Sequence, residues 1–264
     1  HLEKERWVKV RRLPPLPRPL SRHRGCIQSP QVLANSTVWM VARYITDPRR
    51  ESELVVLSSA ETTWRSDSLR EGIRGGMYSI RGLTLAAGRL HLLASQRFRE
   101  REHDGIYYSL FDGTLASPEL ITRSPFNSGG IAVDSSGAVA MAWMDRSEFE
   151  PAQVAFSSRQ SDGWSSPTWL VVRGTSRPDV HRAVGVVGVR LVFDQSRRPI
   201  LIWWNDERVR ERNGVPAMAA AILSNGVWRR VRVDLPAGYV EEVGMGQGNE
   251  LHVIWTESAG HPTD

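Results

Sequence analysis

Three acidic residues stand at comparable points of the chain and could carry out acid–base chemistry. Asp145, Asp206 and Glu257 each lie two residues after a tryptophan, where an apolar segment gives way to a polar one. Hydrolysis of a glycosidic bond typically uses one protonated and one ionised carboxyl group on either side of the bond. Neighbouring carboxylates can raise one pKa by mutual repulsion. The three are therefore our catalytic candidates. The alternative is that they pair with nearby arginines such as Arg146 or Arg208.

Polar and aromatic residues near the same segment ends are candidates for ligand binding. An arginine can hold a carboxylate through two parallel hydrogen bonds, and an aromatic side chain can stack on a sugar ring. Arg43, Arg81 and Arg97 are candidates for the first role, and Trp204 and Tyr44 for the second. The full set of substrate-binding candidates is Arg43, Tyr44, Arg81, Arg97, Asn127, His181, Trp204 and Glu241. The alternative for the arginines is a surface role in an arginine-rich chain.

The segments that carry these residues share one pattern. Each is an apolar strand, a tight polar turn, a second apolar strand that ends in tryptophan, and a polar tip. The clearest copies are residues 130–145, 190–206 and 243–257, and weaker copies are residues 31–44 and 83–97. Turn residues such as those at 134–137 can supply the positive φ angles that a short hairpin needs. The pattern therefore predicts five antiparallel hairpins with the candidate residues at their ends.

A repeat of roughly fifty residues contains these hairpins. A third apolar strand follows each of the first four, and a fourth strand then starts at a marker position: Trp64, Thr114, Trp164 and Trp228, with Trp7 as a further copy. Repeats of four short strands are typical of β-propeller blades. We predict an all-β, five-bladed β-propeller of four-stranded antiparallel blades that forms a single domain over residues 1–264. Its blades are expected at 25–72, 77–122, 127–172, 185–236, and 240–257 plus 5–13.

The last repeat lacks its outer strand, and the N-terminus carries an unassigned one. Residues 5–14 match residues 226–236 closely. We therefore predict that the N-terminal strand joins the last blade and closes the ring, which removes an open sheet edge. The third strand of that blade is not evident in the sequence. The alternative is that the chain is a fragment of a six- or seven-bladed ring.

One segment also resembles a known family. Residues 130–170 read strand-Asp-x-x-Gly-strand-Trp, then Phe156-Ser157, then Asp162-Gly163-Trp164. This resembles the bacterial-neuraminidase-repeat, or sialidase-like, β-propellers, and the resemblance extends over most of residues 25–257. It implies a propeller fold and, for an enzyme, a sialidase-like glycoside hydrolase. Residues 161–164 form a shortened version of the family's Asp-box, with no residue between Asp and Gly.

The polar tips of the five repeats differ from one another, which favours one composite site over five equal ones. We predict a carbohydrate-active or carbohydrate-binding propeller with a glycan or small-molecule ligand at the central channel. If it is an enzyme, we expect a glycoside hydrolase that acts on acidic or plain glycans. The alternatives are a lectin-like module and a protein-interaction scaffold without catalysis.

Composition sets the remaining expectations. Hydrophobic residues make up 41% of the chain, and the formal net charge is +5. The basic residues are nearly all scattered arginines, so we expect no nucleic-acid partner. No apolar run is long enough for a membrane span. The single cysteine, Cys26, excludes an intrachain disulfide. We expect a monomer with no cofactor and no metal site, and the sequence does not support a structural Ca²⁺. His1 favours a secreted or cell-surface protein if it follows a removed leader.

Overall fold

The apolar segments of the chain form β-strands in the computed structural model, and every regular element among the described residues is a strand. The structure describes residues 2–3, 6–7, 26–32, 38–45, 52–60, 63–68, 76–98, 105–112, 114, 116–123, 126–145, 153–171, 186–205, 218–231, 233, 238–246 and 248–257. The predicted all-β class is therefore confirmed for this part of the chain.

Antiparallel sheets follow one another along the sequence, and four of them are built around four strands in chain order. Sheet 1 contains β3 (Cys26–Val32), β4 (Val38–Ile45), β5 (Ser52–Ala60) and β6 (Thr63–Ser68). Sheet 2 contains β7 (Gly76–Ala86), β8 (Arg89–Phe98), β9 (Gly105–Phe111) and β10 (Glu119–Thr122). Sheet 3 contains β11 (Phe126–Val133), β12 (Val139–Asp145) and β13 (Gln153–Gln160), and β13 pairs with both β14 (Gly163–Trp164) and β15 (Thr168–Val171).

Sheet 4 contains β16 (Val186–Phe193), β17 (Pro199–Asn205), β18 (Met218–Ser224) and β19 (Val227–Val231). Sheet 5 has two described strands, β20 (Gly238–Met245) and β21 (Leu251–Glu257). The prediction of four-stranded antiparallel sheets is confirmed for sheets 1, 2 and 4. In sheet 3 the fourth position is divided between two short strands, and between them Ser165 still donates its backbone N–H to the carbonyl oxygen of Ser158 on β13, at 2.9 Å.

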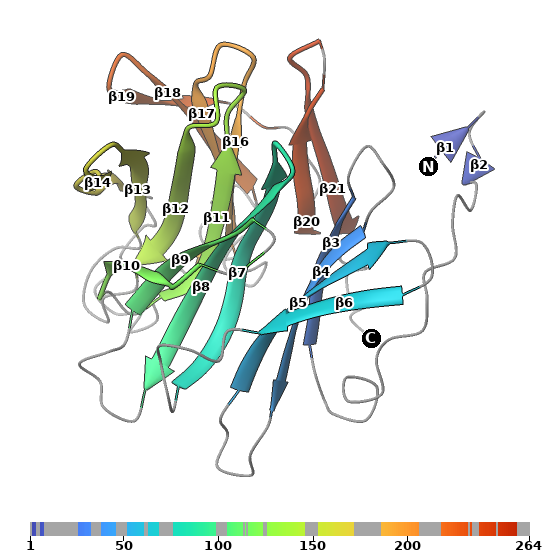
Figure 1. Cartoon of the computed structure of the whole chain (residues 1–264). Coiled ribbons are helices and arrows are strands. Elements are labelled where there is room, and N and C mark those ends of the chain that lie inside the picture. Colours follow the sequence, from blue (N-terminus) through green and yellow to red (C-terminus); the bar gives the residue numbers. More distant parts are fainter. Residues whose placement is uncertain are drawn as a thin grey trace, which may run out of the picture.

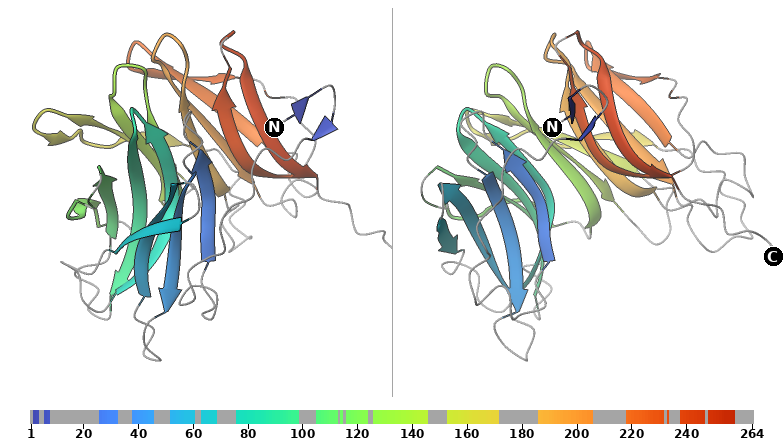
Figure 2. Two further views of the ribbon diagram at one scale, coloured as in Figure 1. Left: turned by 45° about the vertical axis from the view of Figure 1, so that its right-hand side comes forward. Right: turned by 90° about the vertical axis from the view of Figure 1, so that its right-hand side faces the viewer.

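The five sheets pack against one another through their first strands. Strand β3 contacts β7, β7 contacts β11, β11 contacts β16, and β16 contacts β20. Figures 1 and 2 show the sheets lying face to face in this order, with the later strands of each sheet farther out. The first strands therefore share one interior.

The N-terminal strand, predicted to close the ring, is described over four residues only. Strands β1 (Leu2–Glu3) and β2 (Arg6–Trp7) pair with each other, and Trp7 lies opposite Leu2. Among the described residues, β21 has β20 as its only paired strand. Residues 8–13, which hold most of the predicted closing strand, lie outside the described residues. Closure and a count of five blades therefore stay predictions.

The marker tryptophans pack across the boundary between neighbouring sheets. Trp164 of sheet 3 meets Tyr108 of sheet 2 edge-on, with ring centroids 5.3 Å apart. Trp228 of sheet 4 meets Phe156 of sheet 3 in the same way, also at 5.3 Å. Edge-to-face pairs of this kind stabilise by about 1 kcal/mol beyond the burial of their surface. This repeated contact explains why tryptophan recurs at the marker position.

The tight turns between first and second strands share a second repeated structure. In sheet 3 the Asp134 carboxylate accepts hydrogen bonds from the backbone of Ser136 and Ala138, at 2.8 and 2.9 Å. Gly137 follows with a φ of 88°. Arg197 stands at the matching turn position of sheet 4 with a φ of 60°. Such a positive φ is strained for any residue with a Cβ.

We therefore expect Arg197→Gly to raise the free energy of unfolding by about 0.5 kcal/mol. Relief of the left-handed backbone strain outweighs the entropy that glycine adds to the unfolded chain. The measurement is a urea unfolding curve. The converse replacement, Gly137→Ala, is the control and should destabilise by about 1 kcal/mol, since nothing within 4 Å would contact the new Cβ and only the φ of 88° matters. A stability loss in Arg197→Gly would contradict the assignment of strain to this turn.

Candidate functional site

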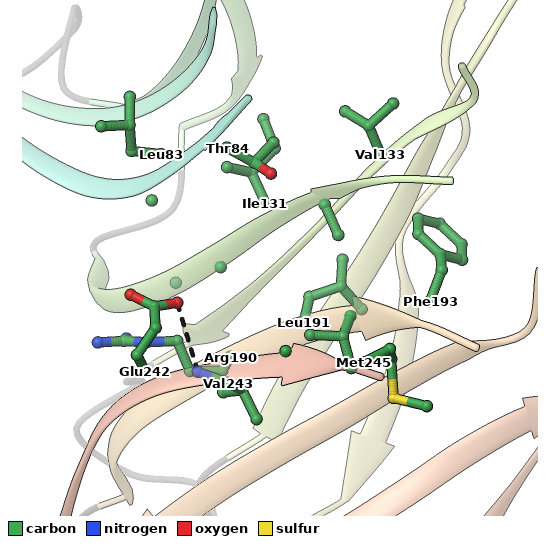
Figure 3. A pocket seen from close by; sticks show the side chains of 16 residues that line it. Leu83, Thr84, Ile131, Val133, Arg190, Leu191, Phe193, Glu242, Val243 and Met245 are labelled. Atoms are coloured by element: carbon green, nitrogen blue, oxygen red, sulfur yellow. Dashed lines mark hydrogen bonds between the residues drawn. The ribbon is translucent and has the colours of Figure 1, made fainter. Parts of the chain in front are cut away.

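The first strands of sheets 2 to 5 enclose a cavity of about 340 Å³ (Figure 3). It is lined by residues 82–84 of β7, 129–133 of β11, 190–193 of β16 and 242–245 of β20. The volume falls at the lower end of the range for small-molecule sites. Strands of four sheets thus line one cavity.

The two rims of the molecule can be assigned from the strand register. Cys26 pairs with Arg43, Phe126 with Asp145, and Gly238 with Glu257, so each first strand begins where its second strand ends. We call this edge the tip rim. The tight turns lie at the opposite edge, the turn rim, which is the upper end in Figure 1.

The charged side chains of the cavity gather at one of its ends. Its charged lining residues among those the structure describes are Arg190 and Glu242, and both lie at the end nearer the tip rim. Val133, Phe193 and Met245 are the last residues of β11, β16 and β20, and they line the end at the turn rim. A charged ligand would therefore meet these two side chains at the tip-rim end.

Glycines allow the inner strands to approach closely around the cavity. A Cβ on Gly82 would lie 3.0 Å from the backbone nitrogen of Ile131, and one on Gly130 would lie 2.7 Å from that of Leu191. Contacts this short require the backbones to move apart. Glycine at these positions therefore sets the spacing of the inner strands.

A β-bulge recurs in the first strand of every sheet. The register shifts lie between residues 28 and 31, 80 and 82, 126 and 129, 186 and 188, and 240 and 242. Bulges bend the strand and change which residues face one side. Three predicted binding residues, Arg81, Asn127 and Glu241, occupy these bulges. The bulges lie at different heights: the β11 bulge follows its first paired residue, Phe126, whereas the β7 bulge follows Ile80, in the middle of the strand.

The Arg190 side chain contacts Val189 and Trp204. Its Nη1 donates a hydrogen bond to the carbonyl oxygen of Val189 at 3.2 Å. Its guanidinium carbon lies 5.3 Å from the ring centre of Trp204, a distance typical of a cation–π contact. The Trp204 ring in turn packs on Gly188, where any Cβ would overlap it.

Trp204 was expected to stack on a sugar ring, and the structure gives its ring different neighbours. The residue is 5% exposed and packs in the core between sheets 4 and 5, with Met218 and Val240. The adjacent Trp203 is 1% exposed and belongs to the core on the other face of sheet 4, between sheets 3 and 4. The described environment of Trp204 is therefore interior packing beside Arg190.

Glu242 lines the cavity from β20 and has an exposed side chain. Its Oε1 accepts a hydrogen bond from the backbone nitrogen of Val243 at 3.3 Å, drawn as the dashed line in Figure 3. Neither Glu242 nor Arg190 was selected as a site residue from the sequence. Side chains alternate between the two faces of a strand, and this alternation was the only sequence signal that could have placed the two residues at the cavity. The bulges add a residue to each strand and so change which side chains face inward.

The other predicted site residues are located by backbone only, or not at all. Asp145 and Glu257 are the last residues of β12 and β21. Arg43 and Tyr44 lie near the end of β4, and Arg97 near the end of β8, at the tip rim. The charged end of the cavity lies farther inside, because Arg190 pairs with Ile202 and Glu242 with Ile254, whereas β17 ends at Asn205 and β21 at Glu257. The side chains of the predicted residues at the tip rim, and those of Arg81, Asn127 and Glu241, lie outside the description, as do Asp206 and His181 entirely.

A second polar cluster lies away from the cavity, between sheets 2 and 3. His91 is 7% exposed, and its Nδ1 lies 2.9 Å from the Tyr108 hydroxyl. Burial, followed by the positive charges of Arg159 and Arg89, lowers the pKa of His91 from 6.5 to about 4. Burial also raises the pKa of Tyr108. Both side chains are therefore neutral at pH 7.

The pKa of His91 is lowered in the folded chain only, so the folded and unfolded chains bind different numbers of protons at acidic pH. Above about pH 6.5 His91 is neutral in both states, and the free energy of unfolding has its full value with respect to this residue. The stability that His91 contributes is lost as the pH falls toward 4, since the unfolded chain then binds the extra proton. Between pH 7.5 and pH 5 we expect a loss of about 2 kcal/mol from this residue. Urea unfolding at the two pH values measures it. His91→Gln should reduce this pH dependence, whereas His252→Gln, at an exposed position, should leave it as in the wild type. An unchanged dependence in His91→Gln would contradict the assignment.

Within the ranges given above, no group of three or more His, Cys, Asp or Glu side chains is placed to bind a metal ion. In the same part of the chain there is no helix with the length and apolar character to cross a membrane.

Comparison with known proteins identifies similar folds. A protein of unknown function from Dyadobacter fermentans has a TM-score of 0.56 and 13% sequence identity, over 88% of this chain and 75% of that one. A thermostable family-43 glycoside hydrolase has a TM-score of 0.49 at 12% identity, over 88% and 83%. An endo-arabinase from Bacteroides thetaiotaomicron has a TM-score of 0.48 at 12% identity, over 86% and 88%. No protein-family model matches the chain, and no curated protein matches its sequence.

Proposed function

We propose that this chain is a carbohydrate-active or carbohydrate-binding β-propeller. Its one composite site lies at the tip-rim end of the cavity between the first strands of sheets 2 to 5, which we call the axial cavity. The observation that carries the proposal is the convergence of four inner strands on one cavity, whose charged end lies toward the rim where β12 and β21 finish. Sugars present many hydroxyl groups, and a cavity with a carboxylate, a guanidinium and exposed backbone suits them.

In the catalytic form of the proposal, Asp145, Asp206 and Glu257 share the acid and base roles. One carboxyl group donates a proton to the leaving oxygen, and an ionised carboxylate on the other side activates water or attacks the sugar carbon. No cofactor is needed for these steps. The sialidase-like version of this activity rests on the resemblance of residues 130–170 to that family.

Substrate positioning in this proposal falls to residues at the tip rim and in the bulges. Arginines can hold an acidic group, and the amide, imidazole, phenol and carboxylate side chains can bond to sugar hydroxyls. The residues assigned here are Arg43, Tyr44, Arg81, Arg97, Asn127, His181 and Glu241. Closure of a five-bladed ring by residues 5–13, which would complete the rim, belongs to the same proposal.

A protein-interaction scaffold is the second candidate, and one observation favours it. Ile254 and Trp255 on β21 are 62% and 37% exposed, whereas the matching tryptophans Trp143 and Trp203 are at most 1% exposed. Exposed apolar residues on a strand edge are typical of sites where another segment binds. A lectin-like module would use the axial cavity without catalysis.

A glycan array together with a panel of chromogenic glycosides separates these functions. Turnover of a glycoside supports the enzyme, binding without turnover supports the lectin, and neither result supports the scaffold. The proposed enzyme is contradicted if the folded protein, verified by circular dichroism, cleaves no glycoside in the panel. We expect a monomer in these assays, which light scattering checks.

A further inference from the structure

We infer that the axial cavity binds an uncharged polyhydroxyl ligand, such as a neutral sugar or a polyol, mainly through backbone N–H and C=O groups on the inner edges of β11, β16 and β20. The inference rests on the proposed function, because it takes the cavity as the ligand site. It adds the chemical class of the ligand and the groups that bind it.

The first step is the direction of the backbone groups on these three strands. At the turn that follows each strand, a backbone N–H donates a hydrogen bond to a carbonyl oxygen on the far side of the turn. The three bonds are Asp134 to Ala138 at 2.9 Å, Asp194 to Arg198 at 3.0 Å and Gly246 to Glu250 at 2.8 Å. Consecutive residues of a strand direct their N–H and C=O groups to opposite sides. Val133, Phe193 and Met245, which precede the donors, therefore direct theirs away from the paired strand, and all three line the cavity (Figure 3).

Two further hydrogen bonds show that this direction continues along the strands. On β16 the N–H of Val189 donates to Ser128 Oγ on β11 at 2.9 Å, so it points away from β17. On β20 the N–H of Val243 donates to the carboxylate of Glu242, which lines the cavity, at 3.3 Å. Leu191 lies two residues beyond Val189 and shares its direction. Each strand thus directs the backbone groups of alternate residues inward.

The second step is that the inner edges of these strands are open. Among the described strands, β11 pairs with β12 alone, β16 with β17 alone and β20 with β21 alone. The side chains of the inward residues pack in the cores between sheets: Ile131 between sheets 2 and 3, Leu191 between sheets 3 and 4, and Val243 between sheets 4 and 5. These residues therefore present backbone, and not side chains, to the cavity.

The third step is the chemistry of an open strand edge. Such an edge carries as many N–H donors as C=O acceptors and has no net charge. Each hydroxyl group both donates and accepts, so a polyhydroxyl ligand can bond to both kinds of group. An ion can bond to only one kind. Among the described lining residues, Glu242 also opposes an anion and Arg190 a cation.

The size of the cavity favours a short ligand. Glycine at positions 82 and 130 lets the inner strands approach closely, because a Cβ there would lie within 3.0 Å of a backbone atom of the next strand. The enclosed volume is about 340 Å³. A small ring or a short polyol can therefore reach the edges of several strands at once.

The first test is calorimetric titration of the full chain with glucose, galactose and mannose, each beside its uronic acid and its 2-amino sugar. At least one neutral sugar should bind about tenfold more tightly than both of its charged counterparts, because a charge loses hydration at an edge that cannot neutralise it. The Kd of that sugar should change less than about twofold when NaCl is raised from about 0.05 to about 0.5 M. A charge-driven complex would weaken over this range.

The second test detects the backbone contacts directly. Amide chemical shifts in a ¹H–¹⁵N correlation spectrum should respond to the neutral sugar in an alternating pattern along each strand. The inward amides of Val133, Phe193 and Met245 should shift more than those of Ala132 and Val192, whose N–H groups point to the paired strand. Contact through side chains alone would produce no such alternation.

Gly244→Val tests the location of the ligand. Gly244 lines the cavity and a Cβ there would meet nothing within 4 Å, so the added side chain takes up open space. Sugar binding should weaken about tenfold or more, while the midpoint of urea unfolding stays near that of the wild type. Ser224→Val is the matched control, because it adds bulk to β18, which does not line the cavity, and it should bind as the wild type does.

Thr84→Val provides a second variant if Gly244→Val does not fold. Thr84 lines the cavity from β7, and valine keeps its shape while removing its hydroxyl group. The loss of one hydrogen bond should weaken sugar binding about twofold to tenfold. Unchanged binding in the folded variants would place the sugar outside the cavity and overturn the inference.

The outcomes distinguish this inference from the proposed function. Tighter binding of a uronic acid or an amino sugar, or amide shifts without alternation, overturns the inference and leaves carbohydrate binding intact. Binding on the glycan array without binding of any sugar in the titration also overturns the inference alone. Binding of no glycan and no sugar overturns both.

Discussion

Asp145→Asn is expected to lower the rate of glycoside hydrolysis about a hundredfold to ten-thousandfold, the usual contribution of a general acid or base. Asparagine has the shape of aspartate, but its amide neither accepts nor releases a proton near neutral pH. Asp145 ends β12, and its backbone pairs with Phe126 on one side and Gln153 on the other. The amide therefore replaces the carboxyl group without a change in strand pairing, and kcat on the best substrate of the glycoside panel measures the effect.

Glu257→Gln at the end of β21 should produce a loss of similar size, because the proposed chemistry needs two carboxyl groups. The matched control is Asp112→Asn. Asp112 is an exposed acid that forms an ion pair with Arg89 at 3.0 Å away from the cavity, and exposed pairs of this kind contribute little. All three variants should unfold within about 0.5 kcal/mol of the wild type. Full activity in Asp145→Asn would remove this residue from the catalytic proposal.

Gly188→Ala is expected to destabilise the fold by about 3 kcal/mol or more. The new Cβ would overlap the Trp204 ring, so the ring or the strand must move within a close-packed core. Displacing Trp204 also disturbs its contacts with Met218 and Val240, which join sheets 4 and 5. The midpoint of urea unfolding, at an unchanged slope, measures the loss.

Gly244→Ala is the matched control for this prediction. Gly244 also lies on an inner strand and lines the cavity, but nothing within 4 Å would contact a Cβ there. We expect its unfolding free energy to stay within about 0.5 kcal/mol of the wild type. If Gly188→Ala is as stable as Gly244→Ala, then the close packing of Trp204 on β16 does not contribute to the stability of the fold as predicted.

Local pattern was enough to predict the sheets. The alternation of apolar strands and polar turns around residues 134–137 and 194–198 predicted hairpins, and the register confirms them. The recurrence of Trp164 and Trp228 predicted an equivalent role in each repeat, and both rings pack on an aromatic residue of the preceding sheet. These features depend on neighbours close in sequence or on a contact that the repeat copies, so one chain reveals them.

The composition of the cavity depended on tertiary structure. Arg190 and Glu242 each follow a bulge in their strand, where one extra residue shifts which side chains face the cavity. A count of alternate side chains along the sequence does not detect that shift. The sequence by itself determined the strands, their antiparallel order and the repeated tryptophans. Only the packing of inner strands from separate repeats decided that Arg190 and Glu242 line the same cavity. Only the tertiary structure placed the Trp204 ring beneath the guanidinium of Arg190. Both contacts join residues that are far apart in the sequence, and a local sequence pattern carries no information about such contacts.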